Sequence, residues 1–455
     1  MPLSASPFLF VQASPQSPFA FSEQARKTAG QNNMAQAATR LRLTARENVV
    51  SPTFFLLVAS MMGYGFGYLY LILMGRMLGP DLSGIVGSLV AIFYVACLVG
   101  QGLREAIATN VAEIKSRQGE GAAVSAFRKF GVKLGLLSVL PGLACIAASG
   151  PIARFFHMDS IGPVVLLGCS LTTALLLDIL LGLLQGLQAF IGFGFLGFLT
   201  SQGLKLLLGV AFVWVGWDLY GAVGALLAST GMSAAIGWFI VRTYLTRNHR
   251  PVDAPHPHLA PVLLPTLLLA VFMAMPTSVD QMLVTHFFNS DDSGVYYAAA
   301  TLGKVVMFLP MPISFVLLPK AVERHALGLS SGRFLARSLA GALLLSGGVA
   351  LVCGFARGHI IKLFFGPEYA EAGDIVGWYG MAMVLFSVNF VLIHYSLAIR
   401  SMKMMLWADL VTLAEILAIA LVHASLSQVI WVLIVGNLIL LLGSTAILGF
   451  AGKRV

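Results

Sequence analysis

Long apolar runs, broken by short polar turns, fill the chain from about residue 53 to residue 450. Each run holds roughly the 20 residues that an α-helix needs to cross the hydrocarbon core of a bilayer. Run lengths and their breaks predict twelve membrane-spanning helices, at residues 53–75, 84–106, 131–149, 161–187, 190–216, 220–244, 261–287, 294–318, 334–356, 375–399, 402–423 and 428–450. The pattern therefore predicts an all-α polytopic membrane protein.

The seventh and eighth runs form a hairpin, Pro265–Glu323, in which each arm carries one ionisable residue inside its apolar stretch. These are Asp280 and Lys304, and a charge at membrane depth is unfavourable by at least about 2.5 kcal/mol. Such groups are retained where they face a protein interior or a water-filled cavity. Bends in the same arms are predicted by the prolines Pro276, Pro310 and Pro312. The hairpin is therefore the first place where we expect helices to open a cavity.

The composition agrees with a membrane protein, and the placement of Lys and Arg along the chain explains the net positive charge. Of 455 residues, 58% are hydrophobic and 10% are charged, whereas soluble domains hold about 25% charged residues. If the N-terminus is cytoplasmic, 22 Lys and Arg residues fall in inner segments and 4 in outer loops. The positive-inside rule then places both termini in the cytoplasm. This distribution, and not nucleic-acid binding, accounts for the net charge of +9.

Residues 1–52 form a polar N-terminal tail ahead of the first span. The tail lacks an apolar region followed by a cleavage site, so it does not read as a signal peptide. Two interpretations stay open: a disordered cytoplasmic tail, or translation that begins at Met34. The rest is predicted to form an N-terminal six-helix lobe (53–250) and a C-terminal six-helix lobe (251–455).

An internal repeat relates the two lobes. The segment DLSGIVGSL (Asp81–Leu89) aligns with DDSGVYYAA (Asp291–Ala299) at a shift of 210 residues. The same shift aligns Val111-Ala112-Glu113 with Ala321-Val322-Glu323. Since six spans separate the copies, both lobes have the same orientation, related by an axis along the membrane normal.

Six ionisable residues lie inside predicted spans: Asp178, Lys205, Asp280, Lys304, Asp409 and Glu415. Charges within both lobes predict a hydrated cavity between them. Lysines at depth would attract an anion such as a phosphate, and the carboxylates of Asp280, Glu415 and Asp178 would bind a coupling H⁺ or Na⁺. The alternative is a set of structural ion pairs, Asp178 with Lys205 and Asp280 with Lys304. Asp409 lies near the cytoplasmic end, where simple solvation explains it.

Helical spacing adds neutral polar residues to this set. Tyr297, Thr301 and Lys304 stand at i, i+4 and i+7 and share one helix face. Asn389 precedes His394 on the tenth span. The candidate substrate-binding residues are Lys205, Lys304, Tyr297, Thr301 and Asn389. The shift of 210 also aligns Lys205 with Glu415, so a cation in the N-terminal lobe corresponds to an anion in the C-terminal lobe.

No other motif predicts catalysis, a cofactor or a metal centre. The sequence has no Walker loop. The glycine-rich stretch 182–198 predicts close helix packing. The four cysteines lie in apolar runs and predict packing residues and no disulfide framework. The histidines of the loop after the sixth span leave metal binding open but unsupported by any ligand spacing: His249, His256 and His258.

Several segments resemble the Wzx-type oligosaccharide flippases of the multidrug/oligosaccharidyl-lipid/polysaccharide exporter superfamily. GRMLGPDLSGIVGSL (75–89) is similar to the first loop of that family, and LLDILLGLLQGLQAF (176–190) to the end of its fourth span. The second lobe matches through SVDQMLVTHFF (278–288), SGVYYAAATLGKVVMFLPMPISFVLLP (293–319) and FFGPEYAEAG (364–373). The chain departs from the pattern at Ile85-Val86, where the family has a tyrosine, and at Gln188-Ala189, where it has a basic residue.

The resemblance implies two pseudo-symmetric six-helix bundles around a central cavity that opens to one side at a time. It implies a non-enzymatic transporter of the bacterial inner membrane. The implied substrate is an undecaprenyl-pyrophosphate-linked oligosaccharide, moved to the outer leaflet for surface polysaccharide synthesis and driven by an ion gradient. The expected partners are this lipid-linked substrate and membrane lipids, with a polysaccharide polymerase and glycosyltransferases as further candidates.

Three alternatives remain at this point. A cation-coupled drug exporter of the MATE type shares the fold but predicts a cavity lined with acids, which two lysines at mid-depth oppose. Lipid II flippases usually carry two further spans. A membrane glycosyltransferase needs a large outer loop, and the longest one here, 357–374, is short.

Overall fold

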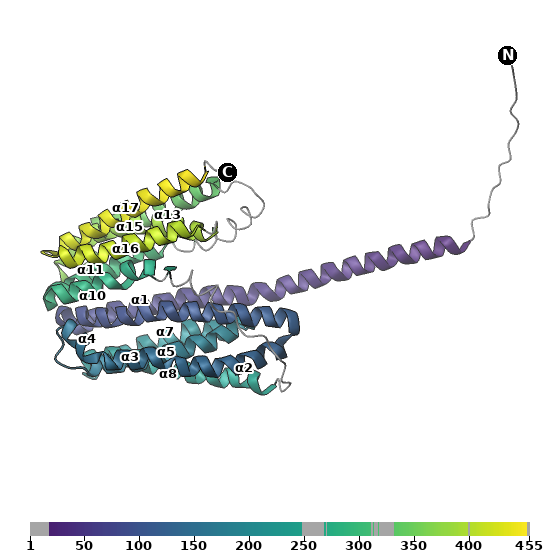
Figure 1. The fold of residues 1–455 in the computed structure, drawn as a ribbon, viewed down its shortest axis with the longest axis horizontal. Coiled ribbons are helices and arrows are strands. Elements are labelled where there is room, and N and C mark those ends of the chain that lie inside the picture. Colours follow the sequence, from purple (N-terminus) through teal and green to yellow (C-terminus); the bar gives the residue numbers. More distant parts are fainter. Residues whose placement is uncertain are drawn as a thin grey trace, which may run out of the picture. The chain divides into compact units, whose positions relative to one another are not determined.

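The computed structural model describes residues 18–247, 268–269, 271–310, 313, 317, 332–398 and 401–452, with side chains for most of them from residue 54 onward. The histidine-containing loop and Pro312 lie outside these residues. The chain divides into two compact units, Met1–Leu57 and Val58–Val455. In the first unit the backbone is helical from Pro18 (Figure 1). For residues 18–52 this corrects the disordered-tail interpretation, because the segment is rich in Ala, Gln and Arg, which favour helix.

Helix α1 (Pro18–Gln118) contains two helical arms separated at Gly79, where φ is 74° and ψ is 174°. Glycine adopts this left-handed region without the steric penalty of a side chain. Pro80 follows and lacks a backbone donor that could extend the first arm. The break lies between the predicted spans 53–75 and 84–106, so α1 accounts for both.

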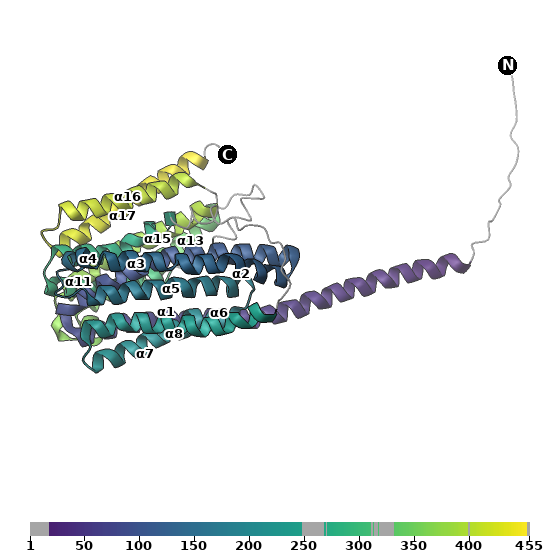
Figure 2. The same ribbon diagram turned by 60° about the horizontal axis from the view of Figure 1, so that its bottom comes forward.

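The remaining N-terminal helices pack side by side. They are α2 (Glu120–Leu137), α3 (Val139–Ala147), α4 (Ser149–Phe155), α5 (Gly162–Gly186), α6 (Phe190–Gly194), the π-helix η1 (Phe195–Thr200), α7 (Ser201–Trp214) and α8 (Asp218–Arg247). Helix α5 contacts α3 and α8, and α8 contacts α7 (Figure 2). A Cβ at Gly186 would lie 2.6 Å from the side chain of Val111, so the glycine-rich stretch does permit close packing on α1.

The C-terminal part contains the π-helix η2 (Met275–Val279), α10 (Asp280–Phe287), α11 (Ser290–Phe308), α13 (Gly332–Phe355), α14 (Arg357–Phe364), the 3₁₀ helix η3 (Pro367–Tyr369), α15 (Ala372–Ala398), α16 (Met402–Leu421) and α17 (Leu426–Gly452). The Asn289 side chain caps α11 by accepting a 2.8 Å bond from the backbone amide of Asp292. Helix α11 ends at Phe308, just before Pro310, which fits the proline's effect on the backbone.

The membrane spans agree with the hydrophobic pattern. Among the described residues, nine helices are long and apolar enough to cross a membrane. One of them, Phe54–Gln118, holds two predicted spans, and the other eight correspond to one predicted span each. The predicted spans 261–287 and 294–318 lie partly outside the described ranges. The structure thus confirms the all-α polytopic class.

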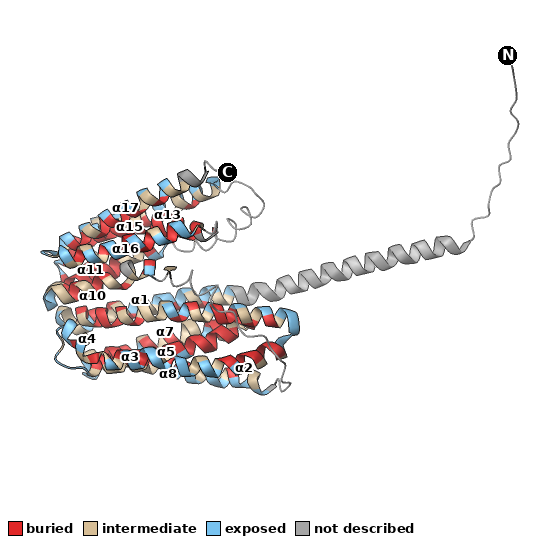
Figure 3. Cartoon of the chain, in the orientation of Figure 1, coloured by how far each residue is buried: buried red, intermediate tan, exposed pale blue. Residues whose placement is uncertain are grey.

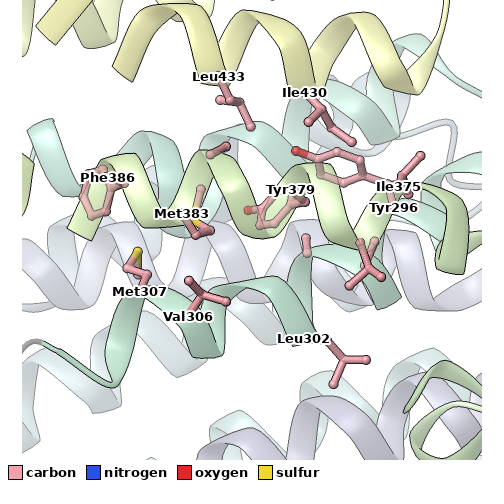
Figure 4. Close-up of a cluster of buried hydrophobic side chains, with 14 of the residues drawn as sticks. Tyr296, Leu302, Val306, Met307, Ile375, Tyr379, Met383, Phe386, Ile430 and Leu433 are labelled. Carbon is pink, nitrogen blue, oxygen red and sulfur yellow. The ribbon is translucent and has the colours of Figure 1, made fainter. Parts of the chain in front are cut away.

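Buried side chains form one large cluster in each lobe. The N-terminal cluster runs from Tyr70 to Leu226, and the C-terminal cluster runs from Phe272 to Leu440 and includes Ile72 of α1 (Figures 3 and 4). Large apolar side chains such as Leu344 (76% exposed) and Phe355 (88% exposed) point away from the core. In a multi-pass membrane protein such residues face lipid. The lobes defined by these clusters are called the N-lobe and the C-lobe below.

Candidate functional site

The predicted ion pair between Asp280 and Lys304 is confirmed in the core of the C-lobe. Lys304 Nζ lies 3.4 Å from Asp280 Oδ1, and Asp280 is fully buried. The hydroxyls of Tyr296 and Tyr379 donate to Asp280 Oδ2 at 3.1 and 2.6 Å, inside the cluster of Figure 4. Because this carboxylate accepts bonds from one cation and two hydroxyls, its charge is well compensated.

The π-helix η2 shapes this pair. It occupies the turn directly before Asp280 and contains the position of Pro276. A π turn interrupts the regular hydrogen-bond ladder and is frequent at functional sites. Lys304 Nζ donates to the carbonyl of Thr277, within this turn, at 3.1 Å. The irregular turn therefore supplies a backbone acceptor to the buried ammonium group.

Lys205 forms the corresponding cluster in the N-lobe. It is 3% exposed, and its Nζ donates to the Tyr94 hydroxyl at 3.3 Å. The same atom lies 5.1 Å from the ring centroid of Tyr70 and 5.5 Å from that of Tyr94. None of the ion pairs among the described residues includes Lys205. Its positive charge is stabilised by the faces of two aromatic rings and by one hydroxyl group.

The two clusters occupy related positions in the repeat. A shift of 210 residues aligns Tyr70 with Asp280, Tyr94 with Lys304, and Lys205 with Glu415. The structure brings Tyr70, Tyr94 and Lys205 together in the N-lobe. In the C-lobe, Glu415 interacts electrostatically with Asp280. The scaffold is thus repeated, while the chemistry is cationic and aromatic in the N-lobe and mostly acidic in the C-lobe.

The predicted pair of Asp178 with Lys205 is wrong. Asp178 instead binds Arg104, with 3.1 Å between Oδ1 and Nη1. Gly100 makes room for it, since a Cβ there would collide with Asp178 Oδ2. The guanidinium of Arg104 also lies 5.6 Å from the ring centroid of Phe193. Within the described part of the chain, Lys205 is consequently left without a carboxylate partner.

The two acidic residues of α16 are buried on the same helix. Glu415 is 7% exposed and packs against Gly436 of α17, where no larger side chain fits. Asp409 is 8% exposed, so the solvation expected for it is wrong. Neither Asp409 oxygen has a hydrogen-bond partner of ordinary geometry among the described residues, and the backbone of Phe272 is its polar neighbour.

The neutral candidates do not all join these clusters. The Tyr297 hydroxyl donates to the carbonyl of Leu71 at 2.7 Å, so it reaches from the C-lobe to α1. Thr301 is buried beside Tyr297. Asn389 donates to the carbonyl of Asn437 at 2.9 Å, between α15 and α17.

A second feature is the contact between the lobes at the repeated turns, which we call the turn interface (residues 71–88 against α10, α11, α14 and η3). Gly84 packs against Ser293, and Gly294 packs against the backbone of Pro80, both so closely that a Cβ would collide. Equivalent turns of the repeat therefore face each other.

Hydrogen bonds across the turn interface accompany this packing. Thr285 Oγ1 donates to the carbonyl of Gly84 at 3.1 Å, and Ser88 Oγ donates to Thr285 Oγ1 at 2.7 Å. The Tyr369 hydroxyl donates to the carbonyl of Gly75 at 2.6 Å. Burial raises the pKa of Tyr369 to about 12, so this hydroxyl remains a donor at physiological pH. The interface is closed by both packing and polar contacts.

Metal ligation finds no support in the part of the chain that the structure describes. There, no three His, Cys, Asp or Glu side chains come together in a way that would hold a metal ion.

Comparison with protein families decides the classification. Residues 49–325, more than half of the chain, match the family model described as "Polysaccharide biosynthesis protein". The chain belongs to the polysaccharide biosynthesis protein family. A search of curated protein sequences finds no significant match.

Solved structures share the fold of this polysaccharide biosynthesis protein. An inward-facing multidrug resistance MATE transporter of the MOP superfamily is 14% identical, with a TM-score of 0.67 over 88% of this chain and 99% of that one. The lipid II flippase MurJ, in an inward closed conformation, is 15% identical, with a TM-score of 0.66 over 88% and 87%. A MOP superfamily transporter from Pyrococcus furiosus is 18% identical, with a TM-score of 0.59 over 89% and 94%.

Sequence reasoning missed several residues of the two clusters. Tyr70 and Tyr94 carried a signal, because the repeat aligns them with Asp280 and Lys304. Arg104 lies at the end of the predicted span 84–106, where a cytoplasmic charge is expected, yet its guanidinium pairs with Asp178. Tyr379 carried no signal, since it comes from a distant helix and reaches Asp280 only in the folded protein.

Proposed function

We propose that this polysaccharide biosynthesis protein is a flippase that moves an undecaprenyl-pyrophosphate-linked oligosaccharide to the outer leaflet of the bacterial inner membrane. The family match and the likeness to transporters support a flippase-type transporter. The substrate, the inner membrane and the cytoplasmic termini are part of the proposal. No step of this transport requires bond chemistry by the protein.

The observation that carries the substrate assignment is the buried Lys205, which has no carboxylate partner among the residues that the structure describes. A buried ammonium is stabilised by an anionic ligand, and a pyrophosphate offers several oxygen acceptors. Tyr94 beside it is partly exposed and provides aromatic surface on which a sugar can pack, while the fully buried Tyr70 supports the ammonium group from its ring face. Lys304 contributes less, because Asp280 already neutralises it. Tyr297, Thr301 and Asn389 are secondary candidates at the edge of the path.

Ion coupling falls to the C-lobe in this proposal. Glu415 and Asp280 are buried and interact with each other, so addition or removal of one cation there changes the local charge balance. Asp178 is a weaker candidate, since Arg104 holds it. The bound ion is H⁺ or Na⁺.

The orientation from the positive-inside rule places the turn interface on the outer side. The lobes are then closed outward, and the chain would load substrate from the cytoplasm. The higher TM-score with the inward-facing MATE structure, 0.67 against 0.58 for an outward-facing one, supports this interpretation. Alternating access requires that the turn interface separate in the other half of the cycle.

Two other substrates are distinguished by experiment. The structural likeness to MATE transporters makes an organic cation an alternative substrate, and the likeness to MurJ makes lipid II another. The buried Lys205, which has no carboxylate partner in the described ranges, opposes an organic cation as substrate. Lipid II differs from the proposed substrate in its glycan and shares the pyrophosphate.

The test uses the full-length protein in liposomes with an undecaprenyl-pyrophosphate-linked oligosaccharide that carries an NBD fluorophore on its glycan. Flipping exposes inner-leaflet glycan to the impermeant reductant dithionite. Lys205→Ala should slow flipping about ten- to a hundredfold, the loss expected for a charge-assisted contact. Lys403→Ala, at an exposed position, is the matched control.

Three outcomes would contradict parts of the proposal. Wild-type rates in Lys205→Ala would remove Lys205 from the substrate path. Accumulation of ethidium without glycan flipping would assign a drug exporter. Flipping of NBD-labelled lipid II in preference to the oligosaccharide would assign the lipid II group.

A further inference from the structure

Gln202 of α7 lies one helical turn before Lys205 and carries a buried oxygen, Oε1, to which no donor in the described part of the chain binds. The two residues stand at i and i+3, so their side chains share one face of the helix. A buried acceptor without a donor is unfavourable. Gln202 belongs neither to the substrate candidates nor to the ion-coupling carboxylates, and its oxygen therefore lacks a role.

Gly67 of α1 leaves a small space against this oxygen. A Cβ at Gly67 would lie 3.4 Å from Gln202 Oε1 and 3.9 Å from Lys205 Nζ, so the amide and the ammonium border the same space. The positive charge of Lys205 favours the amide orientation that places oxygen, not nitrogen, on this side. Gly67 and Gln202 are both partly exposed, so neighbouring side chains do not fill the space.

The space lies where the two lobes meet. Tyr68, which follows Gly67 on α1, packs edge-on against Phe308 of α11 with 5.7 Å between ring centroids. Tyr94, on the second arm of α1, is partly exposed and accepts a hydrogen bond from Lys205. An ammonium group, an amide and an aromatic ring thus border one space, which suits a sugar joined to a phosphate: the ammonium binds the anion, the ring packs against the sugar, and the amide binds its polar groups.

We propose that Gln202 binds the sugar next to the pyrophosphate, in a subsite that Gly67 keeps open beside Lys205. This inference rests on the proposed function, which places the pyrophosphate at Lys205. The amide oxygen accepts from a hydroxyl or an N–H of that sugar, and the amide nitrogen donates to a sugar oxygen. Gln202 thereby makes transport depend on the glycan as well as on the anion.

The amide reaches the sugar by rotation of its own side chain. The terminal torsion of glutamine has broad minima, and rotation of Gln202 breaks no hydrogen bond to Oε1 within the described ranges. In the proposed orientation α7 runs from the cytoplasm outward. Gln202 therefore precedes Lys205 on the side from which the substrate loads.

The experiment adds a second lipid to the liposome flipping assay of the full-length protein. Unlabelled undecaprenyl pyrophosphate, which has the anion and no sugar, competes with the NBD-labelled oligosaccharide lipid, and the labelled lipid is kept far below saturation. The concentration of competitor that halves the rate reports affinity for the pyrophosphate. The rate without competitor reports recognition of the whole substrate. The variant is Gln202→Met, because methionine keeps the side-chain length and removes both hydrogen-bonding groups.

Gln202→Met should lower the rate without competitor about two- to tenfold, the loss expected for a neutral hydrogen bond. It should leave the inhibitory concentration of undecaprenyl pyrophosphate unchanged. Lys205→Ala should lower the rate and raise that concentration, since both lipids share the anion. Gln202→Glu should act like Lys205→Ala in both respects, because a carboxylate at i pairs with the lysine at i+3.

Gly67→Ala fills the space while making only ordinary van der Waals contacts. It should slow flipping about as much as Gln202→Met does. The unfolding temperature in detergent should not fall, since alanine favours helix more than glycine does. Gly65→Ala is the matched control on the same helix, because a Cβ there meets nothing within 4 Å; it should flip at the wild-type rate.

Three results would overturn the subsite. Wild-type flipping in Gln202→Met would leave Gln202 a packing residue. A raised inhibitory concentration in Gln202→Met would place its effect at the pyrophosphate and not at the sugar. Equal flipping in Gly67→Ala and Gly65→Ala would show that substrate does not enter the space beside α1.

Failure of the proposed function has a different signature, because it shows in the wild type. A wild-type protein that flips the oligosaccharide lipid but is not inhibited by undecaprenyl pyrophosphate would have no pyrophosphate site at Lys205. A wild-type protein that flips no oligosaccharide lipid would not be the proposed flippase. The subsite falls with the proposed function in both cases, whereas the three results above leave that function standing.

Discussion

Lys205 and Glu415 occupy equivalent positions in the two lobes, 210 residues apart, one on α7 and the other on α16. Lys205 lies over the ring of Tyr70, and Glu415 interacts with Asp280, which aligns with Tyr70. A duplicated scaffold thus presents a cation in one lobe and an anion in the other. This division separates a site for an anionic substrate from a site for a coupling cation.

The Asp280–Lys304 pair is expected to contribute to stability, in addition to the part in ion coupling that we propose for Asp280. Asp280→Asn leaves a buried ammonium without its counter-charge and should lower the free energy of unfolding by about 3–5 kcal/mol. The double variant Asp280→Asn/Lys304→Met should recover much of this loss, since it removes both charges. Thermal unfolding of the purified protein in detergent measures both.

Flipping by the same double variant separates structure from transport. Recovery of stability and of flipping together would leave the pair a purely structural role. Recovery of stability alone would assign one of the two charges to the transport cycle. A double variant as unstable as the sum of the single variants would contradict the coupling inferred from the 3.4 Å contact.

Asp409 is expected to destabilise the protein. Its two oxygens are buried without ordinary hydrogen-bond partners among the described residues, and such desolvation costs about 1–3 kcal/mol. Asp409→Leu should therefore raise the unfolding temperature, and Asp409→Ala, which adds no bulk, checks for overpacking. A lower unfolding temperature in both variants would show that a cation or proton stabilises this carboxylate in the native protein.

Gly294→Ala should open the turn interface. The new Cβ meets the backbone of Pro80, which has no flexible atom to move aside. Strain of this kind is worth about 1–3 kcal/mol, so the open-to-closed ratio should rise about 5- to 150-fold. The readout is the rate at which an impermeant thiol reagent modifies Ser88→Cys, a fully buried position in the interface.

The control for this variant is Gly347→Ala, because a Cβ at Gly347 meets nothing within 4 Å. Its reagent accessibility at position 88 should match the wild type. Equal rates in all three proteins would mean that the glycine contact does not determine closure.

The spans were predictable because a bilayer imposes a minimum length on every apolar run, and each of the eight single spans overlaps its predicted range. The Asp280–Lys304 pair was predictable for a similar reason: two opposite charges in adjacent apolar arms have few other partners. The repeat was recognisable in the sequence because both copies of its turn contain the residues that a tight turn between two helices requires.

The contacts that the sequence did not predict depend on the orientation of each helix about its axis relative to its neighbours. Asp178 pairs with Arg104 rather than with Lys205, and the sequence does not state which face of α1 meets α5. Tyr297 lies nearer than Tyr296 to the Lys304 face by helical periodicity, yet Tyr296 reaches Asp280 because that carboxylate enters from α10. The packing of one repeated turn against the other could not be predicted either, since the sequence of a hairpin does not show which segment packs on its turn.

The turn interface resembles the contact of a pseudo-symmetric dimer within a single chain. Gly84 meets Ser293 and Gly294 meets Pro80, so each copy of the turn offers its glycine to the other copy. This arrangement approximates the contact by which two identical subunits associate about a two-fold axis, although the partners are not equivalent: Gly84 meets Ser293, whereas its counterpart Gly294 meets the backbone of Pro80. A substitution in one turn must therefore be accommodated by its twin, and the two halves of the chain cannot change independently at this surface, although they differ freely at Lys205 and Glu415.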